Sequence, residues 1–176
     1  MSSLWEQLMR YTPAALALSL LAAVTASVSI SAPPVPLDPR AALLVADGRR
    51  ALASGDTNAA IDAYEAALVI QPGHVAIVLN LAEATRKQGL QGKALRYYRE
   101  VLEGDPGNIY AISGEGMALV EKGAVERARR NLARLEQVCG NSCAPAKDLA
   151  AAIQQGPTPQ IVTVEAVQTK PTVTAN

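Results

Sequence analysis

The sequence has few of the residues from which catalytic and metal sites are usually built. Among 176 residues there is no Phe, one Trp, two Cys and one His. A structural zinc site takes four Cys or His ligands, and this chain has three such residues in all, so we expect no metal and no cofactor. Acidic and basic residues balance at 16 each. Without a net positive charge there is no long-range attraction to nucleic acid, and we expect none as a partner.

No catalytic motif appears either. Three residues separate Cys139 from Cys143, whereas a redox pair usually has two between its cysteines. Ala144 follows Cys143, where covalent haem attachment needs a His. The run Gly114-Glu115-Gly116 lacks the third glycine of a dinucleotide-binding loop. We therefore predict that the chain is not an enzyme and has no catalytic residues.

The amino-terminal segment has the pattern of an export signal. No charged residue occurs from Tyr11 to Ala32, Arg10 precedes this stretch, and a Pro-rich linker at 33–37 follows it. A basic residue, an apolar run and small residues form a secretory signal peptide, although 22 uncharged residues also suffice for a membrane anchor. Residues 1–32 are predicted to be one or the other. We expect a periplasmic protein, soluble after cleavage or anchored to the inner membrane, that meets the membrane only through this segment if it is uncleaved.

Beyond the linker, equivalent residues recur every 34 positions. The matching sets are Gly55, Gly89 and Gly123; Ala60, Ala94 and Ala128; Tyr64, Tyr98 and Leu132; and Pro72, Pro106 and Gly140. A constant period of this length indicates stacked supersecondary units. We assign three units to residues 38–74, 75–108 and 109–142.

Each unit is predicted to be a hairpin of two helices. In the first unit, Asp38 is an amino-terminal cap followed by a proline, and Gly55 ends the first helix. Asp56 begins the second helix and Pro72 ends it. Gly48, Ala82 and Gly116 are expected where the first helices cross their partners, because a small side chain lets two helix axes approach closely.

These residues resemble the tetratricopeptide repeat (TPR) family. The match covers residues 41–142. It rests on the two series of small residues (Gly48, Ala82 and Gly116; Ala60, Ala94 and Ala128), on Leu81, on the aromatic residues Tyr64 and Tyr98, and on Pro72 and Pro106 at the ends of their units. The resemblance implies an all-α fold, a right-handed superhelical stack of antiparallel helix hairpins. Asp47 and Glu115 depart from the family pattern, since both occupy a position that is usually Leu.

The resemblance also implies a partner-binding groove lined by the first helices, with apolar and charged positions mixed. The candidate groove residues are Arg49, Leu79, Glu83, Arg86, Tyr110, Met117 and Val120. Val45, Leu79 and Val120 are expected to be exposed, and charge reversal at Arg86 is expected to leave unfolding unchanged. TPR proteins that clamp the carboxylates of chaperone tails use Lys and Asn where this chain has Val45 and Arg49, which predicts no such clamp.

A final helix is predicted at 143–155, after the third unit. Leu149 and Ile153 would cover the last hairpin, as the end of a repeat stack requires. In an exported chain, Cys139 and Cys143 are close enough in sequence for a disulfide that pins this helix; two free thiols are the alternative. Residues 156–176 contain three prolines and few charges and are expected to be disordered.

The favoured function is a noncatalytic scaffold of the bacterial cell envelope. It would bind a protein or peptide segment in its concave groove for complex assembly, and the resemblance extends to proteins of pilus and secretion machinery. The alternative is a permanent structural subunit of an envelope complex or homo-oligomer, with no free groove.

Overall fold

The computed structural model describes residues 35–157, and within that range the chain forms helices and no strands. The helices are α2 (Pro39–Ala53), α3 (Thr57–Ile70), α4 (Val75–Lys87), α5 (Gln91–Gly104), α6 (Ile109–Glu121), α7 (Val125–Cys139) and α8 (Ala144–Gln155). From Pro36 onward, the described residues belong to one compact unit. The predicted all-α class is confirmed.

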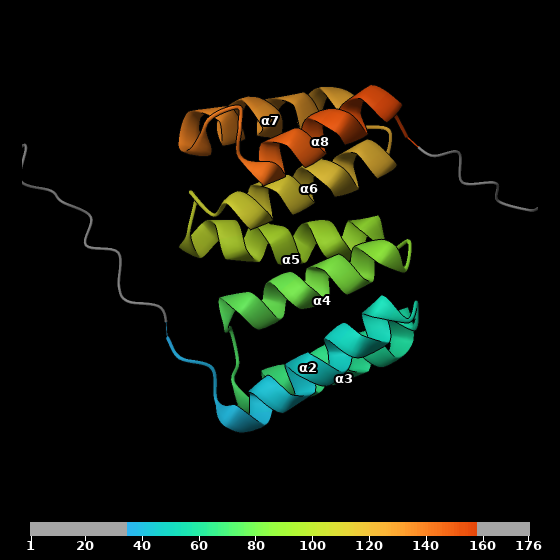
Figure 1. Cartoon of the computed structure of the whole chain (residues 1–176), viewed down its shortest axis with the longest axis vertical. Helices are drawn as coiled ribbons and strands as arrows, with labels where there is room; N and C mark the ends of the chain where they lie inside the picture. Colours follow the sequence, from blue (N-terminus) through green and yellow to red (C-terminus); the bar gives the residue numbers. More distant parts are fainter. Residues whose placement is uncertain (1–34, 158–176) are drawn as a thin grey trace, which may run out of the picture. The chain divides into compact units, whose positions relative to one another are not determined.

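The helices pack in the order in which they occur in the chain (Figure 1). The three expected hairpins pair α2 with α3, α4 with α5, and α6 with α7. Neighbouring hairpins meet through α3 with α4 and α5 with α6, and α8 packs on both helices of the last hairpin. The first helices also contact one another, α2 with α4, α4 with α6, and α6 with α8. These four helices therefore share one side of the stack.

The same backbone motif ends each first helix. Gly55, Gly89 and Gly123 have positive φ values of 85°, 88° and 78°, a conformation that glycine adopts without steric cost. The residue after each glycine donates its N–H to a carbonyl five residues back, Asp56 to Ala51 at 2.9 Å in the first unit. This is the Schellman motif, which satisfies the last carbonyls of a helix. The 34-residue spacing of these glycines thus reflects three identical helix ends.

The predicted caps at the other helix ends are confirmed in the first unit. Asp38 accepts a hydrogen bond from the Arg40 N–H at 2.8 Å, and Asp56 accepts one from the Ala59 N–H at 2.9 Å. Gln71, at the end of α3, also receives the Asp38 N–H and donates to the Pro36 carbonyl. These bonds tie the beginning of α2 to the end of its hairpin.

Glycines decide where the two repeat tyrosines pack. A Cβ on Gly48 of α2 would overlap the Tyr64 ring, so Tyr64 lies against the first helix of its own unit. The second unit has Ala82 in place of Gly48. There, Tyr98 packs instead against the following first helix, where a Cβ on Gly114 would overlap its ring. In both units, the tyrosine ring packs against the neighbouring first helix that has a glycine at the point of contact.

Gly116 does not face its partner helix as expected. A Cβ there would overlap the side chain of Leu149, which belongs to α8. The reason is that α8 packs beside α6 as a further first helix would, so the bare backbone of α6 is used against the cap. The expected small residues Ala60, Ala94 and Ala128 of the second helices are fully buried.

A buried carboxylate joins α5, α6 and α7. Glu115 is 8% exposed and accepts hydrogen bonds from Arg99 Nε at 2.9 Å and Asn131 Nδ2 at 3.0 Å. Asn131 also donates to the Ile112 carbonyl. A buried charge is tolerated when it is paired and hydrogen-bonded in this way. The departure from Leu at this position is therefore accommodated by a polar contact between neighbouring units.

The capping helix lies where the sequence predicts it. Leu149 is fully buried and Ile153 packs partly buried against the same cluster, while Lys147 and Asp148 face outward. A disulfide joins Cys139 to Cys143, whose Cα atoms are 5.9 Å apart, across the turn between α7 and α8. The covalent link holds the start of α8 close to the end of the last hairpin.

The predicted signal peptide or anchor, and nearly all of the predicted tail, lie outside the described residues. Among residues 35–157, no helix combines the length and apolar character that crossing a bilayer requires.

Replacing Gly114 with alanine tests the contact with Tyr98. Gly114→Ala should lower the free energy of unfolding by roughly 1–3 kcal/mol, because the added methyl overpacks against the ring. Gly92→Ala is the matched control: it lies in α5 with nothing near its Cβ position, so alanine should raise the stability by up to about 1 kcal/mol. Denaturant unfolding measures both. In a Tyr98→Ala background the cost of Gly114→Ala should disappear; an unchanged cost would place the strain elsewhere.

Candidate functional site

The first helices enclose a hollow between the second unit, the third unit and the cap. Its volume is about 380 Å³. The lining residues are Leu79, Glu83 and Arg86 of α4, Tyr98 of α5, Tyr110, Ser113, Gly114 and Met117 of α6, and Ala144, Pro145 and Asp148 of α8. The volume lies within the range of ordinary ligand pockets. No group of His, Cys, Asp and Glu in the described part of the chain has the arrangement of a metal site.

The structure brings five of the seven candidate groove residues together around this hollow. They are Leu79, Glu83, Arg86, Tyr110 and Met117. Arg49 does not line it: this side chain is exposed on α2 and donates to Asn80 Oδ1 at 3.4 Å. What these residues bind stays a prediction.

The expected exposure of Val45 and Val120 is wrong. Each is 3% exposed. Val45 packs in a cluster with residues of α4, and Val120 in a cluster with Ala146 and Leu149 of α8. Because neighbouring first helices contact one another, positions at the edge of the predicted groove face the next helix instead of solvent. Leu79 remains partly exposed.

Six lining residues are not among the candidates from sequence: Tyr98, Ser113, Gly114, Ala144, Pro145 and Asp148. From sequence, Tyr98 was recognised only as a repeat position, and Ala144, Pro145 and Asp148 were expected only within the capping helix. The exchange of glycine positions between units, Gly48 in the first and Gly114 in the third, is the signal that could have placed Tyr98. The cap residues follow from the contact of α8 with α6.

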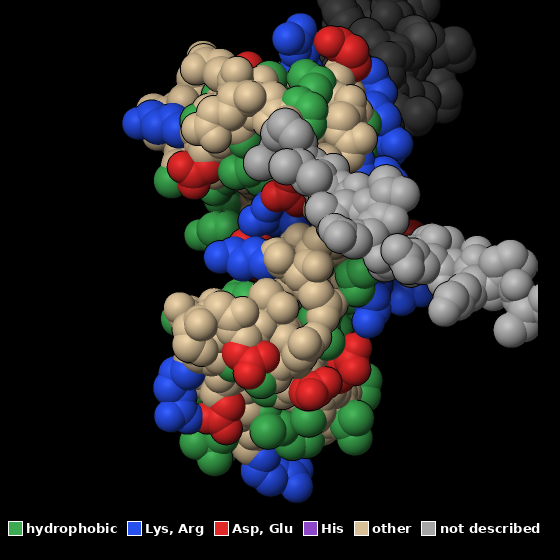
Figure 2. Space-filling model, turned by 90° about the vertical axis from the view of Figure 1, so that its right-hand side faces the viewer, with side chains coloured by type: hydrophobic (Ala, Val, Ile, Leu, Met, Phe, Trp, Pro, Cys, Tyr) green, Lys and Arg blue, Asp and Glu red, His purple; other side chains and the backbone are tan. Residues whose placement is uncertain are grey.

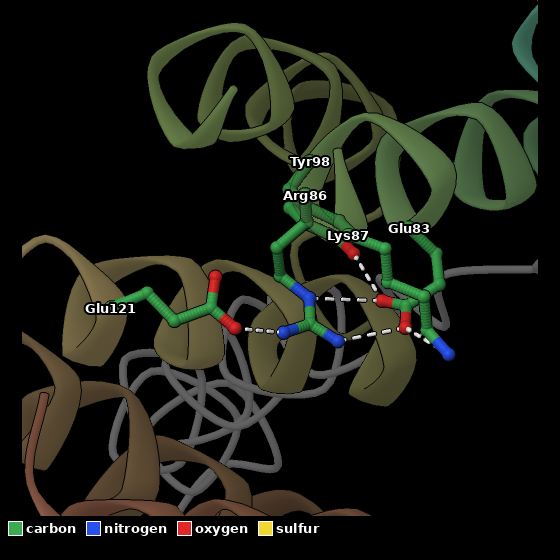
Figure 3. Close-up of polar contacts among 5 residues, drawn as sticks. All are labelled: Glu83, Arg86, Lys87, Tyr98 and Glu121. Atoms are coloured by element: carbon green, nitrogen blue, oxygen red, sulfur yellow. Dashed lines mark hydrogen bonds and ion pairs between the residues drawn. The ribbon is translucent and has the colours of Figure 1, made fainter. Parts of the chain in front are cut away.

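Arg86 forms ion pairs with two carboxylates, those of Glu83 and Glu121 (Figure 3). Its Nε and Nη2 donate to the two oxygens of Glu83, at 3.0 and 2.7 Å, and its Nη1 donates to Glu121. Glu83 and Arg86 share α4, whereas Glu121 belongs to α6. The arginine side chain is 16% exposed. Arg86 therefore links the second unit to the third and has no unpaired charge to offer a ligand.

The protonation states agree with this geometry. Burial by itself would raise the pKa of the Glu83 carboxyl, but the hydrogen bonds and charge of Arg86, the Tyr98 hydroxyl and the Lys87 charge hold that pKa below its usual value. Burial opposes the charge of Arg86, yet its bonds to Glu83 and the charges of both glutamates raise the pKa of Arg86 further. At neutral pH both groups are charged.

Tyr98 completes this cluster. Its hydroxyl donates to Glu83 Oε2 at 3.1 Å, and burial, followed by the Glu83 charge, raises the pKa of Tyr98 well above that of a free tyrosine. The equivalent hydroxyl of Tyr64 is buried without a hydrogen-bond partner among the described residues. Two residues at the same repeat position thus have opposite polar environments.

Positively and negatively charged side chains are mixed on the surface of the molecule. Acidic and basic side chains lie side by side on one face of the molecule, with no large patch of a single sign (Figure 2). This distribution agrees with the zero net charge of the chain.

Charge reversal at Arg86 tests the link between units. Contrary to the expectation from sequence, Arg86→Glu should lower the free energy of unfolding by about 3 kcal/mol, the lower end of the range for buried pairs, because the Glu83 and Glu121 side chains are 34% and 28% exposed. The control is Arg130→Glu in α7, an exposed arginine outside this cluster, which should change stability by less than about 0.5 kcal/mol. Thermal and denaturant unfolding are the measurements, and equal effects at both sites would contradict the role of Arg86.

The two tyrosines offer a matched pair of substitutions. Tyr98→Phe removes a hydrogen bond to a carboxylate and should cost about 1.5–3 kcal/mol. Tyr64→Phe removes a buried hydroxyl that has no partner and should raise the stability by about 1 kcal/mol. Urea midpoints at unchanged slope report both changes. Destabilisation of the same size at both positions would show that the Tyr64 hydroxyl is hydrogen-bonded after all.

Comparison with solved structures identifies the fold. The TPR domain of Sgt2 from Aspergillus fumigatus is 24% identical, with a TM-score of 0.61 over 67% of this chain and 79% of its own. The first TPR of Spaghetti (RPAP3), solved bound to the HSP90 peptide SRMEEVD, is 20% identical, with a TM-score of 0.59 over 68% and 94%.

One of the similar structures is an enzyme, but the match covers only a small part of its chain. A Thermobaculum terrenum O-GlcNAc transferase mutant is 25% identical, with a TM-score of 0.57 over 64% of this chain and 22% of its own. Most of that chain therefore lies outside the match, and its activity does not carry over.

Sequence comparison adds nothing to the structural matches, since no protein-family model and no curated protein matches the chain. At the identities found, the structural likeness shows the fold alone. Residues 39–155 have the fold of TPR domains, three helix hairpins followed by a capping helix.

Proposed function

We propose that the chain is a noncatalytic scaffold that holds a segment of another protein in the hollow between α4, α6 and α8. The observation that carries the proposal is the hollow itself, which opens on the side shared by the first helices. A domain of the same fold has been solved with a peptide bound, the first TPR of Spaghetti.

The residues that line the hollow are better suited to binding a peptide than to catalysing a reaction. Leu79, Met117 and Pro145 supply apolar surface, and the exposed side chain of Tyr110 also lines the hollow. The polar groups are mostly occupied by each other: Glu83 and Arg86 are paired, and Ser113 donates to the Pro145 carbonyl. A catalytic site needs convergent groups that are poised to act on a substrate, and such groups are not assembled at this hollow.

The proposal places this scaffold in the bacterial cell envelope, where it would serve the assembly of a larger complex such as a pilus or a secretion apparatus. Two features support export: the uncharged stretch within residues 1–32, and the Cys139–Cys143 disulfide. Disulfides persist mainly in oxidising compartments. The localisation can be tested by fractionation of cells that express the full chain.

Selection from a random heptapeptide display library tests binding in the hollow. Selected peptides should bind the purified full chain, and Tyr110→Ala should weaken their binding by about tenfold, because tyrosine is enriched among the few residues that carry most of the binding energy of an interface. Tyr110 is 66% exposed, so its removal should leave the fold intact. Val69→Ala is the control: Val69 is 82% exposed on α3 and does not line the hollow. Fluorescence anisotropy gives both dissociation constants.

Two outcomes would contradict the proposal. One is a selection whose peptides bind both variants as tightly as the unmodified chain. The other is a stable oligomer, seen by light scattering, in which Tyr110 is protected from solvent; that result would favour the permanent-subunit alternative. The large exposed apolar residues are distributed over several elements, with Leu43 on α2, Val69 on α3 and Val138 on α7, and scattered single residues of this kind do not mark an interface.

A further inference from the structure

We propose that the hollow selects a segment in which a Lys or Arg stands beside apolar residues, and that Asp148 pairs with this cation. The proposal rests on the proposed function, because it specifies the chemistry of the segment that the same hollow would hold. It is carried by the charges that remain unpaired once the internal ion pairs are counted.

Asp148 is the carboxylate at the hollow that has no partner. It lies on α8, lines the hollow and is exposed to solvent. Within residues 35–157 its side chain forms no ion pair and no hydrogen bond, in contrast to Glu83. A ligand cation could therefore pair with Asp148 without breaking a contact of the folded chain.

The positive charge at the hollow is already neutralised. Arg86 is held by Glu83 and Glu121, and Lys87, half-exposed, lies 4.0 Å from the same Glu83 carboxylate. The second oxygen of Glu121 is buried and has no hydrogen-bond partner among the described residues. Among the charged residues that line the hollow, Glu83 and Asp148 are set against Arg86, so one negative charge is in excess. An acidic segment would meet this excess and find no free cation.

The rest of the lining also favours a cation with apolar neighbours. The exposed ring of Tyr110 can receive a Lys or Arg on its face, an attraction that adds to the pairing with a carboxylate. Leu79 and Met117 of the same hollow provide apolar contact for the neighbouring residues.

One local field acts in the opposite direction. The hollow includes the first two residues of α8, and a helix amino terminus carries about half a positive charge. Asp148 lies one turn further along the same helix and carries a full negative charge. Pro145, near this terminus, has no N–H to offer an anion. The net preference at this end of the hollow is therefore for a cation.

The test compares peptides selected from the heptapeptide library on the full chain and on its Asp148→Asn variant. On the unmodified chain, Lys and Arg should be at least about threefold more frequent than Asp and Glu at one position of the selected peptides. On Asp148→Asn this excess should fall to the background of the library. For one selected peptide, exchange of its basic residue for Gln should weaken binding by up to about fivefold on the unmodified chain, the range of a partly exposed ion pair, and by less than about twofold on the variant.

Asp62→Asn is the matched control. Asp62 is exposed on α3 and does not line the hollow, so its removal changes the net charge equally and should leave the basic preference intact. The acidic probe is one selected peptide whose basic residue is exchanged for Glu, and it should bind the unmodified chain more weakly than its basic parent.

The outcomes separate this inference from the proposed function. Peptides that bind at the hollow without a basic preference, or with a preference that persists in Asp148→Asn, overturn the inference and leave the binding function in place. Tighter binding of the Glu-exchanged peptide than of its basic parent does the same. If no selected peptide is sensitive to Tyr110→Ala, the binding function fails, and the inference fails with it.

Discussion

The contact between the Tyr98 ring and the bare backbone of Gly114 is the constraint on which the site depends. It can form only because the third unit has no side chain at that point of α6. With its ring seated there, Tyr98 places its hydroxyl on Glu83, and Glu83 in turn holds Arg86. Arg86 reaches across to Glu121 of the next unit. The missing side chain at Gly114 thus allows a series of polar contacts from Tyr98 through Glu83 and Arg86 to Glu121. These contacts join the second hairpin to the third and form one wall of the hollow.

These polar contacts also determine what the hollow offers to a ligand. The carboxylates of Glu83 and Glu121 neutralise the Arg86 guanidinium, and the unpaired charged residue that lines the hollow is Asp148 of α8. The capping helix accordingly does more than cover the apolar end of the stack. Its buried Leu149 fits against Gly116, and the same docking brings Pro145 and Asp148 to the hollow. The packing of this helix and the proposed recognition therefore depend on the same contacts.

The repeat pattern predicted much of the site correctly, and the predictions that were wrong have a common cause. Five candidate residues of the first helices do line the hollow, since a helix of known orientation fixes which positions share a face. Val120 was misplaced because a residue on that face is also at the edge of the next helix, and contact between α6 and α8 covers it. Arg86 was taken for a free groove charge because Glu121, its second partner, is 35 residues away in sequence.

The sequence by itself determined the local architecture of residues 39–155. Helix ends at Gly55, Gly89 and Gly123, caps at Asp38 and Asp56, and a final helix that buries Leu149 all depend on contacts within a few residues or on a period that the sequence displays. Only the tertiary structure decided which way each tyrosine packs, which charges cancel and which residues the cap contributes to the hollow. Those outcomes depend on side chains that meet across different helices, where a missing Cβ or a distant carboxylate changes the result and no local pattern records it.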